Sequence, residues 1–294
     1  MATHHNIVKA AIFALFGGLF FAILGIMIKM TTREFSSEVV VFFRQFFSLL
    51  TLMPLLLLER AQGHTLKTKV FPLYLLRTFV SLSAMYCLFY ALKHLTVTDA
   101  LVLSYTRPLF IPLIIWVWFQ KKVKAITWWG LILGFIGVIL VLKPQPHHTF
   151  NVASIIGLAS GLFGGIAFTA VRKLTKTEPP TRIIFYLLIL SLPISIIPAL
   201  SNWQTPTPLI WTYLLVIGIL ATFYQAFVTL AYKYAHTSKV SSILYSAVIF
   251  GAIFDWFFFD QILDFIAIIG VLLICVGSIL VVKDKKALIP MDRK

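Results

Sequence analysis

Charged residues are scarce in this sequence, and acidic residues are the scarcest of them. Of the 294 residues, 12% are charged, and 10 Asp and Glu stand against 25 Lys and Arg. A soluble globular domain carries roughly 25% charged residues, about twice this fraction. The composition therefore argues against a metabolic enzyme with a large soluble core. The sequence also shows no paired carboxylates, metal-ligand cluster, nucleotide-binding loop or Ser-His-Asp arrangement, so we expect no enzyme, no ATP-driven pump and no cofactor.

Cysteine is almost absent, with Cys87 and Cys275 as the two instances. Both lie in apolar stretches, where a free cysteine packs as a small hydrophobic residue, so they say nothing about a redox compartment. We also expect no cleavable signal peptide. The first apolar stretch, residues 10–30, is long for a signal sequence, and the small-residue cleavage pattern is missing.

Apolar residues make up 60% of the chain and come in stretches of roughly membrane-spanning length. The predicted transmembrane helices are Ala10–Met30, Val39–Leu58, Val70–Leu92, Asp99–Phe119, Thr127–Leu142, Ala153–Val171, Ile183–Leu200, Leu209–Ala231, Val240–Phe259 and Ile262–Val282. The connections between them are short. The sequence therefore predicts an all-α integral membrane protein with ten transmembrane helices and no inserted soluble domain.

Lys and Arg are distributed unevenly between the two sides of the predicted membrane. With the N-terminus inside, eighteen lie in inner segments and four lie in outer ones, namely Lys29, Arg33, Lys93 and Lys143. Because cytoplasmic loops are enriched in Lys and Arg, both termini are predicted to be cytoplasmic. This bias also explains the net charge of +15 without nucleic acid as a partner. We expect a multi-pass protein of the bacterial inner membrane, with membrane lipids around it.

The two halves of the sequence resemble each other. Gly18 aligns with Gly161 at an offset of 143 residues, and Tyr105 aligns with Tyr245 at an offset of 140, each within a longer series of matches. Chance does not produce so many matches with one small gap. The sequence therefore contains an internal repeat.

Each repeat holds five predicted helices, which is an odd number, so the second copy must enter the membrane from the opposite face. The predicted domains are a first five-helix repeat at residues 1–147 and an inverted second repeat at residues 148–294. Inverted repeats are typical of secondary transporters, whose substrate site lies near the membrane midplane. A repeat kept only for folding is the alternative, and channels and scramblases can also use this arrangement.

Polar side chains form stripes along single faces of four predicted helices. The stripes are Arg44, Ser48 and Thr51; Ser83, Tyr86 and Tyr90; Thr222, Gln225, Thr229 and Lys233; and Ser238, Ser241, Ser242 and Tyr245. A polar face has no place against lipid, so these stripes should either bond helix to helix or line a watery cavity. We favour the cavity, because each of the four stripes carries Tyr, Gln or Arg.

Five of these residues are predicted to face one central space and to take part in substrate binding. They are Tyr86, Tyr90, Gln225, Thr229 and Tyr245. Aromatic rings there could stack on a flat group of the substrate, and plain packing is the alternative for the rings.

Three arginines, Arg44, Arg77 and Arg107, lie within predicted helices. Arg44 and Arg77 lie close enough to helix ends for snorkelling, whereas Arg107 lies near mid-membrane. Asp99 and Asp264 fall at the ends of predicted helices, and Asp255 is the acidic residue that falls farther inside one, near its outer end. Structural ion pairs are the alternative for each arginine, but the scarcity of acids favours a substrate that brings its own negative charge. We therefore also place Arg44 and Arg107 at the substrate site.

Arg107 is followed by Pro108, with Pro112 one turn farther on. Each proline removes a backbone donor, so the helix should bend here and free carbonyl groups at substrate depth. The partner of the guanidinium could be those carbonyls, Asp255, or a carboxylate or phosphate of the substrate, and we favour the substrate. Tyr105 and Arg107 are two residues apart and can line one wall only if the bend turns the helix.

The sequence resembles members of the drug/metabolite transporter superfamily in its EamA-type form, which has two repeats and ten helices. The resemblance covers nearly the whole chain, and the branch of bacterial S-adenosylmethionine transporters looks most similar. The matching strings are Phe42-Phe43-Arg44, Leu76-Arg77, Tyr90-Ala91-Leu92, Thr98-Asp99-Ala100, Pro108-Leu109-Phe110, Gly134-Phe135-Ile136-Gly137 and Lys143-Pro144. The resemblance implies metabolite transport without naming the substrate, because the fold serves many metabolites.

The sequence thus predicts a secondary carrier of a small organic metabolite, amino-acid-like or S-adenosylmethionine-like and anionic or zwitterionic, which works by alternating access. Proton-coupled carriers usually hold a carboxylate or histidine deep in the membrane, and none is seen here, so exchange or facilitated transport is favoured. A flippase for a lipid or lipid-linked sugar is the alternative, and a scaffold subunit without transport is a third interpretation. A homodimer is left open.

Overall fold

The computed structural model describes residues 6–32, 35–62, 65–95, 97–142, 152–259, 265–283 and 288–290. Nearly all of them are helical. The helices are α1 (Ile7–Thr32), α2 (Ser37–Ala61), α3 (Phe71–His94), α4 (Val97–Ser104), α5 (Arg107–Phe119), α6 (Ala125–Leu142), α7 (Val152–Leu174), α8 (Pro180–Ser201), α9 (Pro208–Tyr234), α10 (Thr237–Ile243), α11 (Ser246–Phe259) and α12 (Phe265–Lys283). Ten stretches are long and apolar enough to cross a membrane, with α4 and α5 forming one span and α10 and α11 another. The predicted all-α fold of ten membrane-spanning helices is confirmed.

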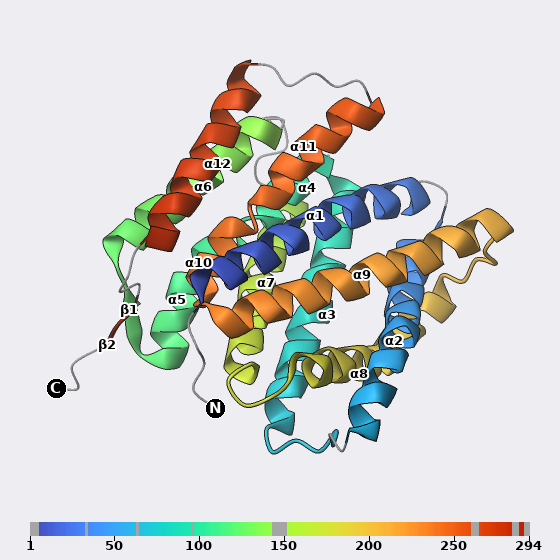
Figure 1. Ribbon diagram of the computed structural model, residues 1–294. Coiled ribbons are helices and arrows are strands. Elements are labelled where there is room, and N and C mark those ends of the chain that lie inside the picture. The colour runs from blue at the N-terminus through green and yellow to red at the C-terminus, as the bar shows by residue number, and fades with distance from the viewer. Residues whose placement is uncertain are drawn as a thin grey trace.

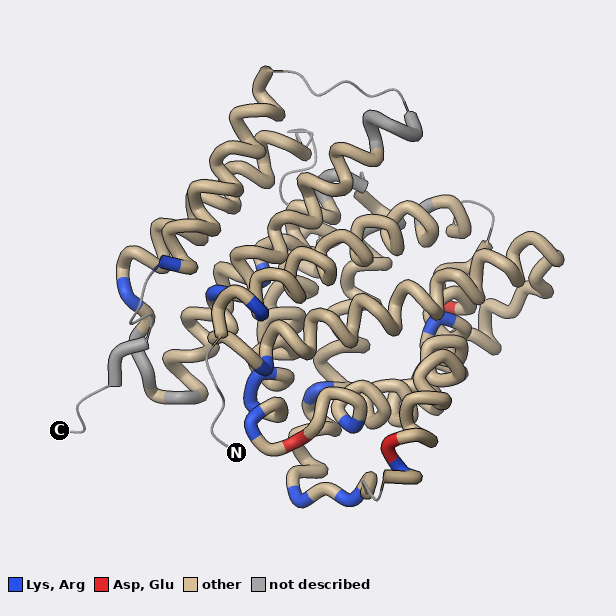
Figure 2. The backbone as a smooth tube through the Cα atoms, viewed as in Figure 1, with Lys and Arg blue, Asp and Glu red and all other residues tan. Residues whose placement is uncertain are grey.

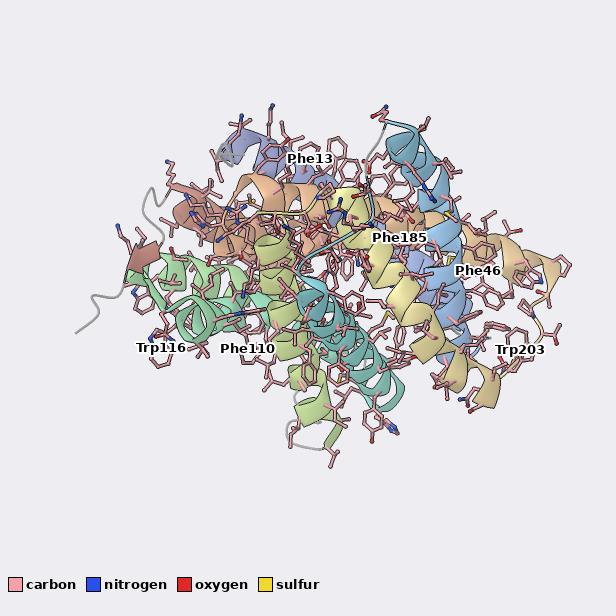
Figure 3. The ribbon with its side chains drawn as sticks, turned by 90° about the horizontal axis from the view of Figure 1, so that it is seen from below. Phe13, Phe46, Phe110, Trp116, Phe185 and Trp203 are labelled. Atoms are coloured by element: carbon pink, nitrogen blue, oxygen red, sulfur yellow. The ribbon has the colours of Figure 1, made fainter. Side chains whose placement is uncertain are left out.

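Large apolar side chains lie on the outside of the bundle. Phe46, Trp116 and Trp203 are 38%, 49% and 47% exposed, and Figure 3 shows where they lie along the ribbon. In water these side chains would be buried, because exposing their apolar surface is unfavourable. The outer surface therefore suits contact with lipid.

The helices of the two halves pack mainly on each other rather than within one half. α1 packs along α9, and its repeat counterpart α7 packs along α3. α1 also contacts α10 and α11, just as α7 contacts α4 and α5, and α6 pairs with α12 at one side of the bundle (Figure 1). This exchange of equivalent partners is the pattern of an inverted repeat. The predicted boundary at residues 147 and 148 lies outside the described residues, so the division into two domains stays a prediction.

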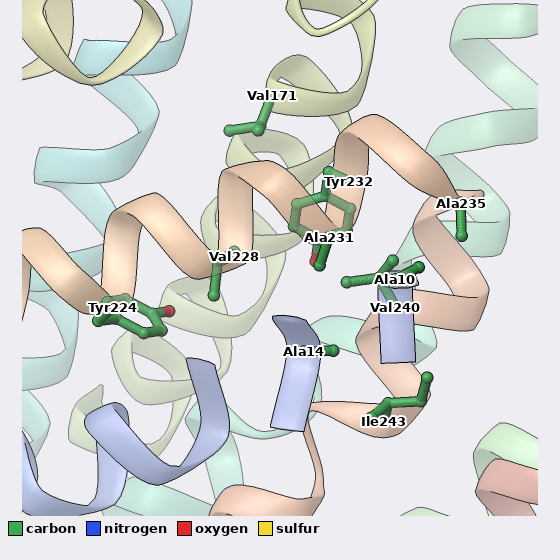
Figure 4. Packing of buried hydrophobic residues seen from close by; sticks show 10 residues of the cluster. All are labelled: Ala10, Ala14, Val171, Tyr224, Val228, Ala231, Tyr232, Ala235, Val240 and Ile243. Atoms are coloured by element: carbon green, nitrogen blue, oxygen red, sulfur yellow. The ribbon is translucent and has the colours of Figure 1, made fainter. Parts of the chain in front are cut away.

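Small residues allow the close contact between α1 and α9. Ala10 and Ala14 of α1 are fully buried beside Val228 and Ala231 of α9 (Figure 4). Because an alanine adds little bulk, the two helix backbones can approach each other closely. The contact holds α1, from the first half, firmly against the second half.

The predicted helix Asp99–Phe119 is broken into α4 and α5, which confirms the bend expected at Pro108. A proline has no N–H, and its ring clashes with the carbonyl four residues earlier. That carbonyl belongs to Ser104, and α4 ends at this residue. The chain resumes its helical course at Arg107.

The predicted helix Val240–Phe259 is also broken, and here the prediction of one continuous helix was wrong. α10 ends at Ile243, and α11 begins at Ser246, without a proline between them. The N–H of Tyr245 bonds to the Ser242 carbonyl at 3.3 Å, one residue closer than in an α-helix. Ser278 Oγ of α12 donates to the same carbonyl at 2.8 Å. Hydrogen bonds of this kind compete with the regular helical pattern and produce the break.

Two short strands were not expected from the sequence. β1 (Lys121–Val123) follows α5, and β2 (Leu288–Pro290) follows α12; they pair antiparallel, with Val123 opposite Leu288. They connect the C-terminal segment to the α5–α6 connection. Most Lys and Arg gather toward the lower side of the bundle in Figure 2, where both chain ends also lie in Figure 1. This distribution agrees with both termini lying on the same side of the membrane. That this side is the cytoplasmic one stays a prediction.

Candidate functional site

Arg107 lies at the break between α4 and α5, near the middle of its span. Its Nε donates to the Ser104 carbonyl at 3.0 Å, and its Nη2 donates to Ser104 Oγ. This carbonyl is the one that Pro108 leaves without a helical donor. The freed carbonyl of Ser104 is therefore one partner of the guanidinium. Bonding to such carbonyls was one of the three alternatives that the sequence left open. The side chain of Asp255, another alternative, lies outside the described residues.

Three aromatic rings surround the guanidinium of Arg107. Its Cζ lies 5.8 Å from the ring centroid of Phe21, 5.9 Å from that of Tyr105 and 5.5 Å from that of Phe168. Rings at such distances attract a cation through their quadrupole and offset part of the energetic cost of a charge in the membrane. They bring no negative charge, and among the described residues no carboxylate forms an ion pair with Arg107.

A cavity lies beside Arg107, and both helix breaks contribute to its wall. The residues from the breaks are Tyr105, Arg107, Pro108, Leu244, Tyr245 and Ala247. Phe21 of α1, Phe168 of α7 and Tyr224 of α9 are also in the wall. The cavity volume is about 20 Å³, which is room for about one water molecule. Since pockets for small organic ligands have volumes of roughly 300–1,000 Å³, the helices must move apart to admit a metabolite.

Glycines bring α1 and α7 close to the two breaks. A Cβ on Gly18 would lie 2.7 Å from Ser246 Oγ and 3.2 Å from the nitrogen of Ala247. A Cβ on Gly161 would lie 2.9 Å from the Leu103 carbonyl oxygen, so neither position has room for one. These are the two glycines aligned by the repeat, and each packs its helix against the break of the other half.

The predicted site residue Tyr245 lines the cavity together with Tyr105, its counterpart in the repeat. Tyr245 is 1% exposed, and its hydroxyl has no hydrogen-bond partner among the described residues. A buried hydroxyl without a partner is unfavourable until water or a ligand bonds to it. Tyr105 and Arg107 reach the same cavity because the chain turns between α4 and α5. From the sequence, such a bend was required for both residues to line one wall.

Gln225 and Thr229, two other predicted site residues, lie outside the wall of this cavity. Gln225 Oε1 accepts a hydrogen bond from Arg77 Nη2 at 3.4 Å, and Arg77 Nη1 donates to the Ile183 carbonyl. This pair connects α3, α8 and α9. Thr229 is fully buried, and its hydroxyl lacks a partner among the described residues.

Arg44, Tyr86 and Tyr90, on α2 and α3, also lie outside the cavity wall. Arg44 is 9% exposed, and the hydroxyl of Tyr86 is buried. Tyr90 is 41% exposed, and its ring centroid lies 4.5 Å from that of His94. Tyr90 lies near the end of α3, where its ring packs against the exposed side chain of His94, and its place at a central space stays a prediction.

Sequence reasoning missed three aromatic residues of the cavity wall, namely Phe21, Phe168 and Tyr224. Aromatic residues are common in apolar helices, so their type alone carried no signal. Their spacing does carry one, because Phe21 follows Gly18 by three residues and Phe168 follows Gly164 by four, which places each ring on the glycine face of its helix. Within the described part of the chain, no three His, Cys, Asp or Glu residues gather as a metal site would require.

Comparison with known proteins shows which family model, relatives and solved structure match this chain. The family model of EamA-like transporters matches residues 8–143 and again residues 151–283. The pseudopaline exporter of Pseudomonas aeruginosa is 26% identical over 95% of this chain and 97% of its own length. The riboflavin transporter of Vibrio cholerae is 26% identical over 89% of each chain, and the S-adenosylmethionine uptake transporter of Rickettsia bellii is 26% identical over 87% of each. A protein crystal structure superimposes with a TM-score of 0.80 over 93% of this chain and 96% of that one, at 14% identity, which shows the fold alone.

Proposed function

We propose that this chain, which belongs to the EamA-like transporter family, is a secondary carrier that moves a small organic metabolite with a carboxylate or phosphate group across the bacterial inner membrane. The observation that carries the proposal is Arg107, a cation in the membrane interior at the wall of the central cavity. An anionic group of the substrate would supply its countercharge through the guanidinium fork. The relatives named above transport small molecules and lend no support to the flippase alternative.

The architecture of the site supports alternating access. The cavity is too small for a metabolite, and its wall comes from spans of both halves. Rocking of one repeat against the other would enlarge it toward one side of the membrane at a time. The glycine contacts of Gly18 and Gly161 leave smooth helix faces at the two breaks, along which such a motion can proceed.

The substitution pair Arg107→Ala and Arg107→Lys tests the substrate site. In purified protein, metabolites that bear a carboxylate or phosphate should raise the melting temperature of the wild type, because a ligand that binds only the folded state stabilises it. Arg107→Ala should abolish this shift, and Arg107→Lys should keep part of it. Arg60→Ala, at an exposed arginine near the end of α2, is the matched control and should behave like the wild type. Normal binding by folded Arg107→Ala protein would refute the proposal.

We further propose exchange or facilitated transport without proton coupling, since the described cavity wall contains neither a carboxylate nor a histidine. Uptake into proteoliposomes should therefore be the same with and without an imposed pH gradient. Concentrative uptake that collapses with an uncoupler, at constant charge on the substrate, would contradict this.

Both termini are proposed to be cytoplasmic, in keeping with the excess of Lys and Arg on one side. Single cysteines introduced at residues 2 and 290, in a chain without Cys87 and Cys275, should resist a membrane-impermeant thiol reagent added from the periplasm. Labelling of either position from that side would overturn the orientation.

A further inference from the structure

Two of the buried arginines of this protein are well bonded to backbone carbonyls. Arg172 Nη1 donates to the carbonyls of Tyr232 and Lys233 at 2.7 and 2.9 Å, at the C-terminal end of α9. A cation there satisfies unpaired carbonyls and interacts favourably with the helix dipole. Arg77 donates to the Ile183 carbonyl and, at 3.4 Å, to Gln225, while its Nε has no partner among the described residues. Both arginines connect helices through bonds to backbone carbonyls, and a structural role accounts for them.

Arg44 is buried to a similar degree but is poorly bonded. It is 9% exposed, and its hydrogen-bond acceptors among the described residues are Gln45 Oε1 at 3.4 Å and Met85 Sδ at 3.5 Å. The distance to Gln45 Oε1 is long for an N–H···O bond, and a thioether sulfur is a weak acceptor. A guanidinium has five N–H donors, so most of the bonding capacity of Arg44 is unused. Burial of a cation with so few partners is unfavourable and requires an explanation.

A contact between α2 and α9 lies close to Arg44. The position of α2 against α9 is fixed by two hydrogen bonds, in which Ser48 Oγ donates to the Gly218 carbonyl and Thr222 Oγ1 donates to the Ser48 carbonyl. Arg44 therefore lies on α2 one turn from a rigid contact with α9.

Tyr224 connects this region to the cavity. It lines the cavity beside Arg107, and it follows by two residues Thr222, which bonds to α2 one turn from Arg44. A ligand that contacts Tyr224 from the cavity therefore lies beside Arg107 and next to the contact of α9 with α2 that is close to Arg44. Among the described residues, no carboxylate forms an ion pair with either arginine.

We propose that Arg44 is a second anion-binding position of the carrier, and that the substrate bears two anionic groups, one for Arg107 and one for Arg44. This inference rests on the proposed function and narrows its substrate class. A substrate with two anionic groups would neutralise both buried cations at once, which a monoanion cannot do.

The test compares pairs of probes on purified protein. Each pair is a linear dicarboxylate and the monocarboxylate of the same chain length, and a series of lengths covers the unknown spacing. In the wild type, at least one dicarboxylate should bind on the order of tenfold more tightly than its monocarboxylate, since a second charge-assisted contact contributes that much. Arg44→Gln should remove this advantage and leave the binding of the monocarboxylate at Arg107 in place.

The outcomes separate this inference from the proposed function. If dicarboxylates and monocarboxylates bind equally well and both depend on Arg107, the second position is refuted and the proposed function stands. The same holds if the advantage of the dicarboxylate survives in Arg44→Gln. If no carboxylate at any length binds, both proposals lose their support.

Thermal stability without any ligand provides a second readout that does not depend on the probe. Arg44→Gln should leave the melting temperature unchanged or raise it, because it removes a poorly bonded buried cation while retaining a hydrogen-bonding group. Arg172→Gln is the matched control and should lower the melting temperature, because it breaks two short bonds to carbonyls. If Arg44→Gln lowers the melting temperature as much as Arg172→Gln does, Arg44 is structural, and the second anion-binding position is refuted.

Discussion

The two helix breaks occupy equivalent places in the two halves of the molecule but carry different chemistry. At the first break, Pro108 frees the carbonyl of Ser104, and Arg107 bonds to it. At the second break no proline is present, and Ser278 stabilises the irregular turn through the carbonyl of Ser242. Where the first break has Arg107, the second has Ala247 at the aligned position.

The difference indicates that the site is not symmetric although the fold is nearly so. The first break supplies the cation, whereas the second supplies the hydroxyl of Tyr245, which is buried without a partner among the described residues. Under the proposed function, a substrate in the cavity would place its anionic group toward α4 and α5 and a hydrogen-bonding group toward α10 and α11.

The largest expected effect separates the chemistry of the two breaks. Arg107→Met should weaken binding of an anionic substrate on the order of a hundredfold, because a charge-assisted hydrogen bond contributes about 1.5–3 kcal/mol. Tyr245→Phe, which removes one neutral hydroxyl, should weaken it about threefold to tenfold, or roughly 0.5–1.5 kcal/mol. Both are measured by ligand titration on purified protein. Equal losses in the two variants would show that the two breaks contribute alike and would remove the asymmetry.

A second prediction compares how tightly α7 and α1 pack on the two breaks. Gly161→Ala should destabilise the fold by about 1–3 kcal/mol, because the new methyl group would meet the backbone of Leu103 and the side chain of Thr106. Gly18→Ala should cost less, since its closest contact is the rotatable hydroxyl of Ser246. Denaturation in detergent measures both.

Gly25→Ala is the control for these two variants, because nothing lies within 4 Å of a Cβ at that position. Within a helix this change should stabilise the protein by roughly 0.5–1 kcal/mol. If Gly18→Ala proves more harmful than Gly161→Ala, the comparison of the two contacts is wrong.

The smallest expected effect concerns the serine at the second break. Ser278→Ala should lower the free energy of unfolding by about 1 kcal/mol, the contribution of one buried neutral hydrogen bond, and should leave anion binding at Arg107 unchanged. Ser201→Ala, which removes an exposed bond to the Ile197 carbonyl, serves as the control and should have almost no effect. A loss of anion binding in Ser278→Ala would mean that the two breaks are coupled through the cavity.

Much of the fold could be predicted from local patterns in the sequence. Apolar stretches located the ten spans, and the proline after Arg107 located the first break. The second break was missed because serines, unlike proline, break a helix only when a partner such as Ser278 is in reach. The alignment of Tyr105 with Tyr245 would have transferred the first break to the second half, since repeats tend to share their irregularities.

The candidate site was harder to predict, because its members come from spans distant in sequence. Arg107 and Tyr245 were identified from their chemistry, and both line the cavity. Phe21, Phe168 and Tyr224 were not, because a ring in an apolar helix has the same local pattern whether it faces lipid or a cavity. Tyr90 lies outside the wall of this cavity, and its place on a polar stripe did not reveal that it is 41% exposed.

The sequence by itself determined the membrane class, the number of spans, the internal repeat and the position of a cation near mid-membrane. These conclusions follow from the hydrophobicity of the stretches, from the odd number of helices in each repeat and from the chemistry of single residues. All of these can be read along the chain without knowing how the helices pack. Only the tertiary structure decided that Arg107, Tyr245 and Tyr224 meet at one cavity and that Arg44 is buried with weak partners while Arg172 is well bonded. Packing between helices decides such matters, because the distance from a side chain to its partners depends on how backbones far apart in sequence approach each other.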